Sequence, residues 1–242
     1  MLAILRKEIN SFLGSPVAYI IMAVFLTAIG LMLWVFPETS LLDYGYADLG
    51  TFFNLTPYVM LFLVPALTMR LFAEEVRTGT LEWLLTRPLS RWGLVVGKFA
   101  ASWVLVAGLL LPTLVYYLSI YQLGNPVGNI DSASVLGSYL GLLLLGGVFA
   151  AIGLFASSLN DNQVVAFVIG VFLSFLLYVG LSAVAGLSFW GPLAYPLSWM
   201  ALDEQYRALG RGLIDSRNVV FLLSVTVLFL FFTERRLAAY QR

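Results

Sequence analysis

The chain has 242 residues, of which 61% are hydrophobic and 11% charged, and its 13 basic and 13 acidic residues cancel. A soluble domain of this length cannot bury so much apolar surface, so the composition predicts an integral membrane protein. Cysteine and histidine are absent, which excludes disulfides, thiolate chemistry and the commonest metal ligand and general base. The balanced charge also leaves no basic field for nucleic acid.

Helices dominate the pattern from the start of the chain. Residues 1–16 carry charge and show no signal-peptide cleavage site, so we expect them to be retained ahead of the first apolar stretch. Apolar stretches long enough to span a bilayer as helices cover residues 17–36, 52–71, 94–121, 135–159, 164–187 and 219–233. Pro112 predicts a kink or a ragged end in the third stretch, and the short sixth stretch should extend at one of its ends.

The segment between the second and third stretches, residues 70–91, is too polar to cross a membrane. Gly79 can open a short helix there, Pro88 can end it, and Ser90 can cap the next span. Its apolar face consists of Leu81, Leu84 and Leu85, which fall at helical spacing. By spacing alone this amphipathic helix is either an anchor in the lipid headgroups or a docking element for a soluble partner.

Basic residues indicate the orientation of the spans, because Lys and Arg concentrate in cytoplasmic loops. With the N-terminus in the cytoplasm, all 13 Lys and Arg residues are cytoplasmic except Arg207, Arg211 and Arg217. Both termini are then cytoplasmic, and residues 188–218 form the longest outer segment. Residues at spacings of three to four predict a short amphipathic helix within it, with a solvated loop as the alternative: Leu202, Tyr206, Leu209 and Leu213.

Catalytic groups are hard to find in this sequence. The spans contain almost no charge, which argues against a proton-coupled carrier and against an intramembrane hydrolase. The run from Gly93 to Lys98 is one residue too short for a P-loop and lacks its Ser or Thr. We therefore expect any ATP hydrolysis to come from another polypeptide.

Several motifs resemble those of ABC-2 type transporter permeases, and the resemblance covers nearly the whole chain. They are LRKEINSFLGSPVAY at 5–19, VPALTMRLFAEE at 64–75, GTLEWLLTRP at 79–88, GLFASSLNDNQ at 153–163 and GRGLIDSR at 210–217. The first and last of these most resemble the gliding-motility-associated branch of the family.

The resemblance implies a single all-α permease domain of six spans in a bacterial cytoplasmic (inner) membrane. It implies an N-terminal elbow helix at 1–16, a cytoplasmic coupling helix at 74–88, and short or re-entrant extracellular helices within 188–218. It further implies two protein partners, a separate cytoplasmic ABC ATPase that uses ATP and Mg²⁺ and a second permease chain. No cofactor and no metal is expected on this chain itself.

The same resemblance assigns candidate site residues. Docking and coupling to the ATPase are expected at Glu74, Glu75, Arg77, Gly79, Thr80, Leu81, Glu82, Leu84, Leu85 and Pro88. A second set lies in the inner loop between the fourth and fifth spans, at Asn160, Asp161, Asn162 and Gln163. The leading hypothesis is a non-enzymatic permease subunit of an ATP-driven exporter, and the alternative is a membrane scaffold that recruits soluble partners.

Overall fold

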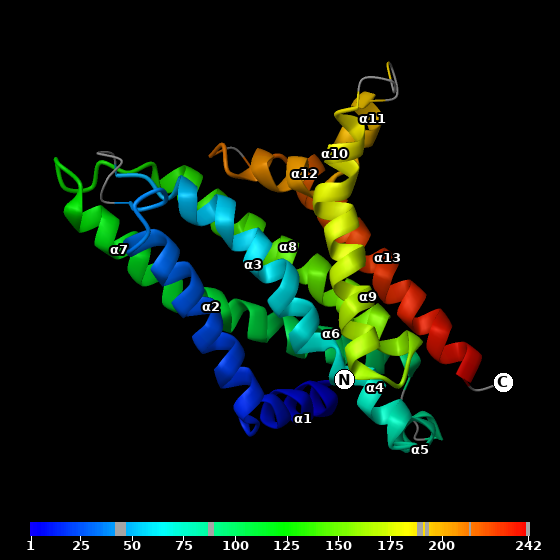
Figure 1. The fold of residues 1–242 in the computed structure, drawn as a ribbon. Helices are drawn as coiled ribbons and strands as arrows, with labels where there is room; N and C mark the ends of the chain where they lie inside the picture. The colour runs from blue at the N-terminus through cyan, green and yellow to red at the C-terminus, as the bar shows by residue number, and fades with distance from the viewer. Residues whose placement is uncertain (42–46, 87–89, 188–190, 192–193, 213, 241–242) are drawn as a thin grey trace.

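The computed structural model describes the chain except residues 42–46, 87–89, 188–190, 192–193, 213 and 241–242, and the side chain of Leu85. Every regular element among the described residues is a helix. Long helices run side by side as a bundle, and short helices lie at its two ends (Figure 1). We name the ends by these short helices, the α1/α5 end for α1 (Leu2–Leu13) and α5 (Thr80–Thr86), and the α12 end for α11 (Ala194–Trp199) and α12 (Leu202–Leu209).

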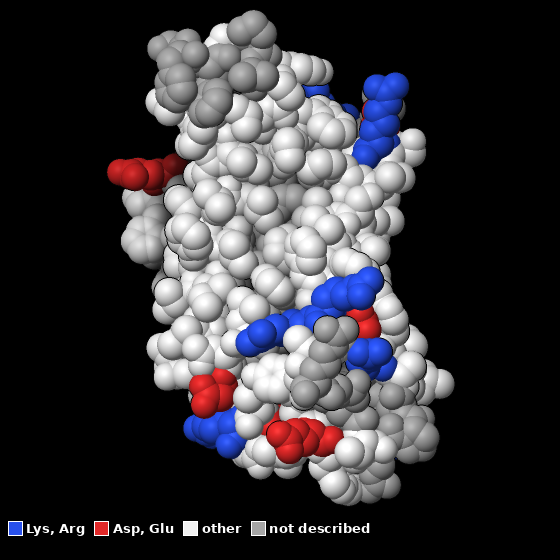
Figure 2. All heavy atoms as spheres, turned by 90° about the vertical axis from the view of Figure 1, so that its right-hand side faces the viewer, with Lys and Arg blue, Asp and Glu red and all other residues white. Residues whose placement is uncertain are grey.

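Six helical segments of the described chain are long and apolar enough to cross a membrane. They consist of α2 (Pro16–Trp34), α3 (Gly50–Thr68) with α4 (Arg70–Arg77), α6 (Arg91–Leu110) with α7 (Leu114–Leu123), α8 (Ser132–Leu159), α9 (Gln163–Phe175) with α10 (Leu181–Ala185), and α13 (Ser216–Tyr240). On the face seen in Figure 2, a broad band without charged side chains separates the two ends of the bundle. The structure therefore confirms an all-α, six-span membrane fold.

The sequence explains where several of these helices begin and bend. Ser90 caps α6 as expected, since its Oγ accepts the Gly93 N–H at 3.1 Å. The third span bends at the 3₁₀ turn η1 (Leu111–Thr113), which contains Pro112 and confirms the predicted kink. The fifth span has a π-helical turn, η2 (Leu176–Gly180), between α9 and α10.

Helix α8 forms the centre of the bundle, because 83% of its membrane-spanning window is buried. Small residues allow its neighbours to approach closely. A Cβ at Gly153 would collide with Thr68 Oγ1 of α3, so glycine is required at this crossing. The peripheral α2 and the α9–α10 span each bury only 22% of their windows and leave most of their surface for lipid.

Helix α12 covers the end of α8 that lies opposite α1 and α5. The spacing predicted a helix in this segment, and three of its four apolar positions, Leu202, Tyr206 and Leu209, are buried. Tyr206 Oη donates a hydrogen bond to the Phe53 carbonyl at 2.8 Å, which ties α12 to α3. The fourth position, Leu213, lies outside the described residues.

Candidate functional site

Four segments meet at the α1/α5 end and carry most of the residues that the sequence analysis selected. Helix α1 lies across the bundle, α4 continues the direction of α3 beyond Met69, α5 turns away from α4, and α6 begins beside them (Figure 1). Side chains from α1, α4 and α6 form a closed ionic cluster, which we define as Lys7, Glu8, Glu75 and Lys98.

Lys98 is the centre of this ionic cluster. Its side chain is 1% exposed, and its Nζ lies 2.9 Å from Glu8 Oε1 and 2.8 Å from Glu75 Oε1. The third N–H of the ammonium donates a hydrogen bond to the Leu71 carbonyl at 2.7 Å. A buried ammonium with three acceptors is fully satisfied, which is the condition under which a buried charge is tolerated. Lys98 therefore joins α6 to both α1 and α4.

Lys7 lies at the solvent side of the cluster and brings its formal charge to zero. Its Nζ is 3.1 Å from Glu8 Oε1 and 3.2 Å from Glu75 Oε1, and its side chain is 58% exposed. Burial alone would raise the pKa of Glu8, but the ammonium groups of Lys98 and Lys7 outweigh burial, so the pKa lies below its ordinary value. Burial alone would lower the pKa of Lys7, but Glu8 and Glu75 outweigh it and raise the pKa.

A second set of contacts connects the C-terminal end of α1 to α4. The guanidinium of Arg70 lies 4.3 Å above the ring of Phe12, whose side chain is buried, and its Nη1 donates to Ser15 Oγ at 3.3 Å. Cation–π contacts of this kind are worth about 0.5–2 kcal/mol. Helix α1 is thus attached to α4 at two places, by Lys7 to Glu75 near its middle and by Phe12 to Arg70 at its C-terminal end.

Ser157 of α8 fixes the start of α4. Its Oγ accepts the Phe72 N–H at 2.9 Å and the Ala73 N–H at 3.0 Å, and it donates to the Met69 carbonyl at 2.8 Å. Phe72 lies in the first turn of α4, where backbone N–H groups have no acceptor within their own helix, and Ala73 is the next residue. Ser157 therefore acts as a cap supplied from another span, and it couples α4 to α8.

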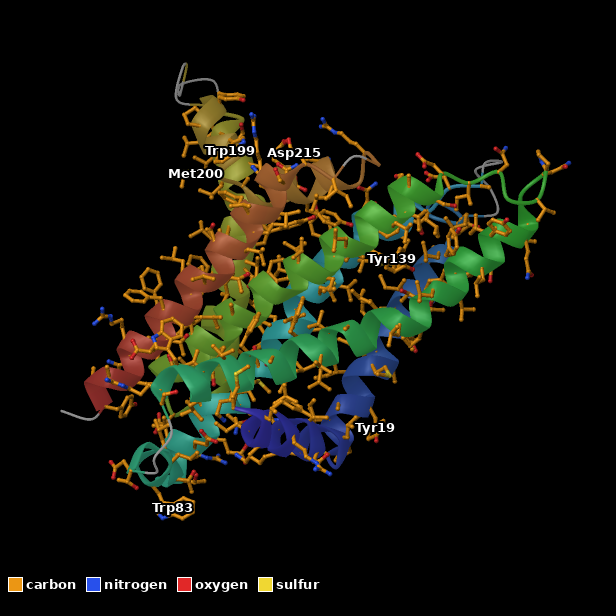
Figure 3. The ribbon with its side chains drawn as sticks, turned by 180° about the vertical axis from the view of Figure 1, so that it is seen from behind. Tyr19, Trp83, Tyr139, Trp199, Met200 and Asp215 are labelled. Atoms are coloured by element: carbon orange, nitrogen blue, oxygen red, sulfur yellow. The ribbon has the colours of Figure 1, made fainter. Side chains whose placement is uncertain are left out.

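The turn between α4 and α5 depends on Gly79, whose φ of 69° favours glycine. This turn divides the predicted coupling helix at 74–88 into two parts: residues up to Arg77 continue the second span, and only Thr80–Thr86 form a separate helix. Leu81 is 2% exposed and holds α5 against the bundle. Trp83 is 61% exposed and lies at the tip of α5, pointing away from the bundle (Figure 3).

The selected docking residues differ in their exposure. Those that face solvent are Glu74, Arg77, Gly79, Thr80 and Glu82. Leu84 is half-buried, whereas the Leu85 side chain and Pro88 lie outside the described residues. Glu75 is a correction, because we expected it to contact the ATPase and the structure buries it at 8% exposure against Lys98.

The inner loop at Asn160–Gln163 forms a tight turn between α8 and α9. Asn160 Oδ1 accepts the Asn162 N–H at 3.1 Å, and Asn162 Oδ1 accepts the Val164 N–H at 2.9 Å. The two asparagines therefore shape the turn and cap α9. Asp161 is exposed and Gln163 is half-buried.

Sequence reasoning missed Lys98, Ser157 and Trp83. Lys98 was considered only as part of the imperfect P-loop, although a lysine inside an apolar helix is itself a signal for a buried partner. Ser157 lies in the matched motif at 153–163 but carries no distinctive local pattern. Trp83 lies between the residues selected on either side of it, on the exposed face of the short helix.

A family model described as ABC-2 family transporter protein matches residues 2–237. This chain belongs to the ABC-2 transporter family. No curated protein matches it at a significant level. In this ABC-2 family protein, no three acidic residues of the described chain lie close enough together to hold a metal ion. At the α1/α5 end, the exposed short helix α5 is connected through α4 to the second, third and fourth spans.

Proposed function

We propose that this chain is the permease subunit of an ATP-driven exporter, and that α5 docks on a separate cytoplasmic ATPase. The observation that carries the proposal is the connection between α5 and the spans. Helix α5 is held by Leu81 and continues from α4, which is joined to α1 and α6 through Lys98 and to α8 through Ser157. A displacement of α5 would therefore move several spans together as a rigid body.

The exposed side of α5 has the composition of a protein-docking surface. It presents the large aromatic side chain of Trp83 beside the charged Glu82, and the exposed Glu74 and Arg77 of α4 lie just before it. Tryptophan is enriched among the residues that dominate binding energy at interfaces, and charged rims direct the partner into register. A helix that only anchored the chain in headgroups would place its tryptophan against lipid rather than at the tip.

The proposal places the α1/α5 end in the cytoplasm. Basic residues at this end and at the C-terminal end of α13 include Arg6, Lys7, Arg77, Arg91, Arg235 and Arg236, whereas Arg207, Arg211 and Arg217 belong to the α12 end. This asymmetry is the one that orients membrane proteins with their basic loops inside. Both termini of the chain are then cytoplasmic.

The transport cycle follows from these positions. Binding of ATP would bring two ATPase subunits together, each ATPase would carry the α5 helix docked on it, and α4 would move the attached spans. A second permease chain would supply the other half of the pathway. A role in gliding motility rests on the resemblance of the motifs at 5–19 and 210–217 to that branch of the family.

The alternative is a membrane scaffold that recruits a soluble protein to α5 without transport. The two functions predict different partners, because an exporter requires a P-loop ATPase and a scaffold does not. A gene for such an ATPase beside the gene for this chain would favour the exporter.

The test is affinity purification of the chain from native membranes in mild detergent, with identification of the co-purifying proteins. We expect a P-loop ATPase that is lost when Trp83→Ala is introduced, because removal of a central aromatic anchor typically costs about 2 kcal/mol or more of binding. The matched control is Tyr195→Ala, which removes an aromatic side chain that is 77% exposed at the α12 end. Recovery of the chain without any ATPase, or equal ATPase recovery with Trp83→Ala, would contradict docking through α5.

A further inference from the structure

We propose that the outer face of α13 and the start of α6 bind an anionic phospholipid. The site is an apolar groove of about 560 Å³, and Arg235 lies over the ring of Phe231 at one end of it. Its lining includes Trp92 of α6 and, from α13, Val220, Leu223, Val227, Leu228 and Phe231. The proposal is independent of ATPase docking and concerns a different face of the molecule.

The groove follows one stripe of α13. Val220, Val227 and Phe231 recur at helical spacing, and Arg235 continues the same stripe one turn further. From Val220 to Phe231 the helix rises by about 16 Å, at about 1.5 Å per residue. The hydrocarbon of one leaflet is about 15 Å deep, half of a core of about 30 Å. Arg217 and Arg235 mark the two ends of α13 and lie about 27 Å apart along the helix, so the groove crosses most of the bilayer. Its part from Val227 to Phe231 lies in the leaflet at the α1/α5 end, within reach of one acyl chain whose headgroup is at Arg235.

This stripe is the uncovered side of α13. Leu222 and Phe229, on the inner side, are buried against the bundle, whereas Val220 and Val227 are 59% and 58% exposed. Figure 2 looks onto this side of the molecule and shows basic side chains gathered below the uncharged band. Among the described residues, nothing covers the groove, so its occupant comes from outside the chain.

The arginines select the headgroup. The Arg235 guanidinium lies 4.8 Å from the centre of the Phe231 ring, so its charge stands at the end of the groove. The Trp92 and Phe231 rings, 6.4 Å apart, close the groove at this level. Arg91 precedes Trp92 and contacts Glu234, the residue before Arg235 in α13. Tryptophan at this depth is typical of the membrane interface, and basic residues between spans at this level bind acidic headgroups.

The local charge remains positive after internal pairing. Arg91 Nε is 3.5 Å from Glu234 Oε1, a long contact to a carboxylate that is only 9% exposed. Arg235 and Arg236 lie over aromatic rings and have no acidic partner in the described chain. A phosphate would therefore accept hydrogen bonds from guanidinium groups that retain unused donors.

The charges favour a lipid over a second copy of the chain. In a two-fold dimer about an axis along the membrane normal, an α13–α13 contact would bring both arginine groups to the same membrane level, where they would repel each other. An anionic phospholipid instead neutralises them and fills the groove with its acyl chain. The proposal therefore assigns the Phe231 end of the groove to a lipid of the leaflet at the α1/α5 end.

The binding test uses the purified full-length chain in detergent, titrated with phosphatidylglycerol or phosphatidylcholine of identical acyl chains and followed by native mass spectrometry. We expect tighter retention of phosphatidylglycerol, and a loss of on the order of tenfold or more in the double variant Arg91→Gln/Arg235→Gln. The matched control, Arg211→Gln/Arg217→Gln, removes two arginines from the α12 end and should bind normally. Equal retention of both lipids, or normal binding by the first double variant, would overturn the proposal.

Two further variants separate the groove from surface charge and from assembly. Val227→Trp fills the groove without changing the charge and should also weaken phosphatidylglycerol binding. Unchanged binding would show that the acyl chain does not occupy the groove. Arg91→Lys/Arg235→Lys should retain most of the binding, which controls for misfolding of the glutamine variant. Because the native chain has no cysteine, rapid disulfide dimerisation of Val227→Cys in native membranes would show a second copy in the groove and exclude the lipid.

Discussion

Lys98 and Glu8 lie 90 residues apart in the sequence, yet their side chains meet at 2.9 Å in a buried ion pair. This contact attaches α1 to the third span at Lys98, which also contacts Glu75 of α4. The short helix at the N-terminus is consequently part of the joint that would receive force from α5.

Removal of the Lys98 charge should be strongly destabilising. The substitution Lys98→Met leaves the buried carboxylates of Glu8 and Glu75 with only the exposed Lys7 as an ammonium partner, at a cost of about 3–5 kcal/mol. Thermal unfolding of the detergent-solubilised chain measures this effect. Lys7→Met is the matched control, because Lys7 contacts the same oxygens but is 58% exposed and should cost less than about 1 kcal/mol. Equal losses for the two lysines would show that burial does not govern the cluster.

Acid should release α1 from the bundle. The pKa of Glu8 lies below its ordinary value of 4.5, so its contribution to stability is complete above that value and is lost as the pH falls through the lowered pKa. The groups that face Glu8 are Lys7 and Lys98, with Glu75 sharing both lysines. Protection factors of the α1 amides, which correct for the pH dependence of intrinsic exchange, should fall as the pH drops below 4.5 while those of α8 stay high. Protection of α1 that does not change with pH would contradict this assignment, and Glu8→Gln should abolish the pH dependence of protection.

Ser157→Ala should weaken the joint between α4 and α8. The substitution removes the acceptor that Ser157 Oγ supplies to the Phe72 and Ala73 N–H groups, and loss of such a cap costs about 1–2 kcal/mol. Ser158→Ala is the adjacent control, since Ser158 Oγ only donates to the Phe155 carbonyl of its own helix. Unfolding midpoints in one detergent provide the comparison. A larger loss for Ser158→Ala than for Ser157→Ala would be inconsistent with capping across the spans.

Glu82 tests whether α5 contacts a partner. If α5 only lies at the membrane surface, Glu82→Ala should change stability by a few tenths of a kcal/mol, about as exposed helical charges do. Under the proposed docking, the same substitution should weaken ATPase binding by about 2 kcal/mol, or more than tenfold, because a desolvated partner loses its pair. Charge reversal at Glu82 should uncouple ATP hydrolysis from transport with the fold intact. A variant lacking both Glu82 and Arg77 that binds and couples normally would leave α5 as an anchor.

The orientation can be tested directly, because the native chain contains no cysteine. Asp131 caps α8 through its Oδ1, so a cysteine is better placed at the neighbouring exposed Asn129. Asn129→Cys should react with a membrane-impermeant thiol reagent added to intact cells, and Asp161→Cys should react only after permeabilisation. The reverse pattern would place the α1/α5 end outside and refute docking of a cytoplasmic ATPase.

Local sequence was sufficient to predict the six spans of this protein. Six spans follow from apolar length, the bend in the third span follows from Pro112, and the start of α6 follows from the cap at Ser90. Each of these features depends on residues within a few positions of one another, because chain length, proline geometry and capping are local properties.

The partners of the charged residues depended on the tertiary structure. Glu75 has the same local pattern as the exposed Glu74, and only the arrival of α1 and α6 decides that one carboxylate is buried and the other is not. Lys98 meets Glu8 and Glu75 across 90 and 23 residues, and Ser157 meets Phe72 across 85. No helical period encodes such separations, because side-chain periodicity identifies a buried face but not the group that lies opposite it. These contacts among α1, α4, α6 and α8 therefore form only when the spans pack together.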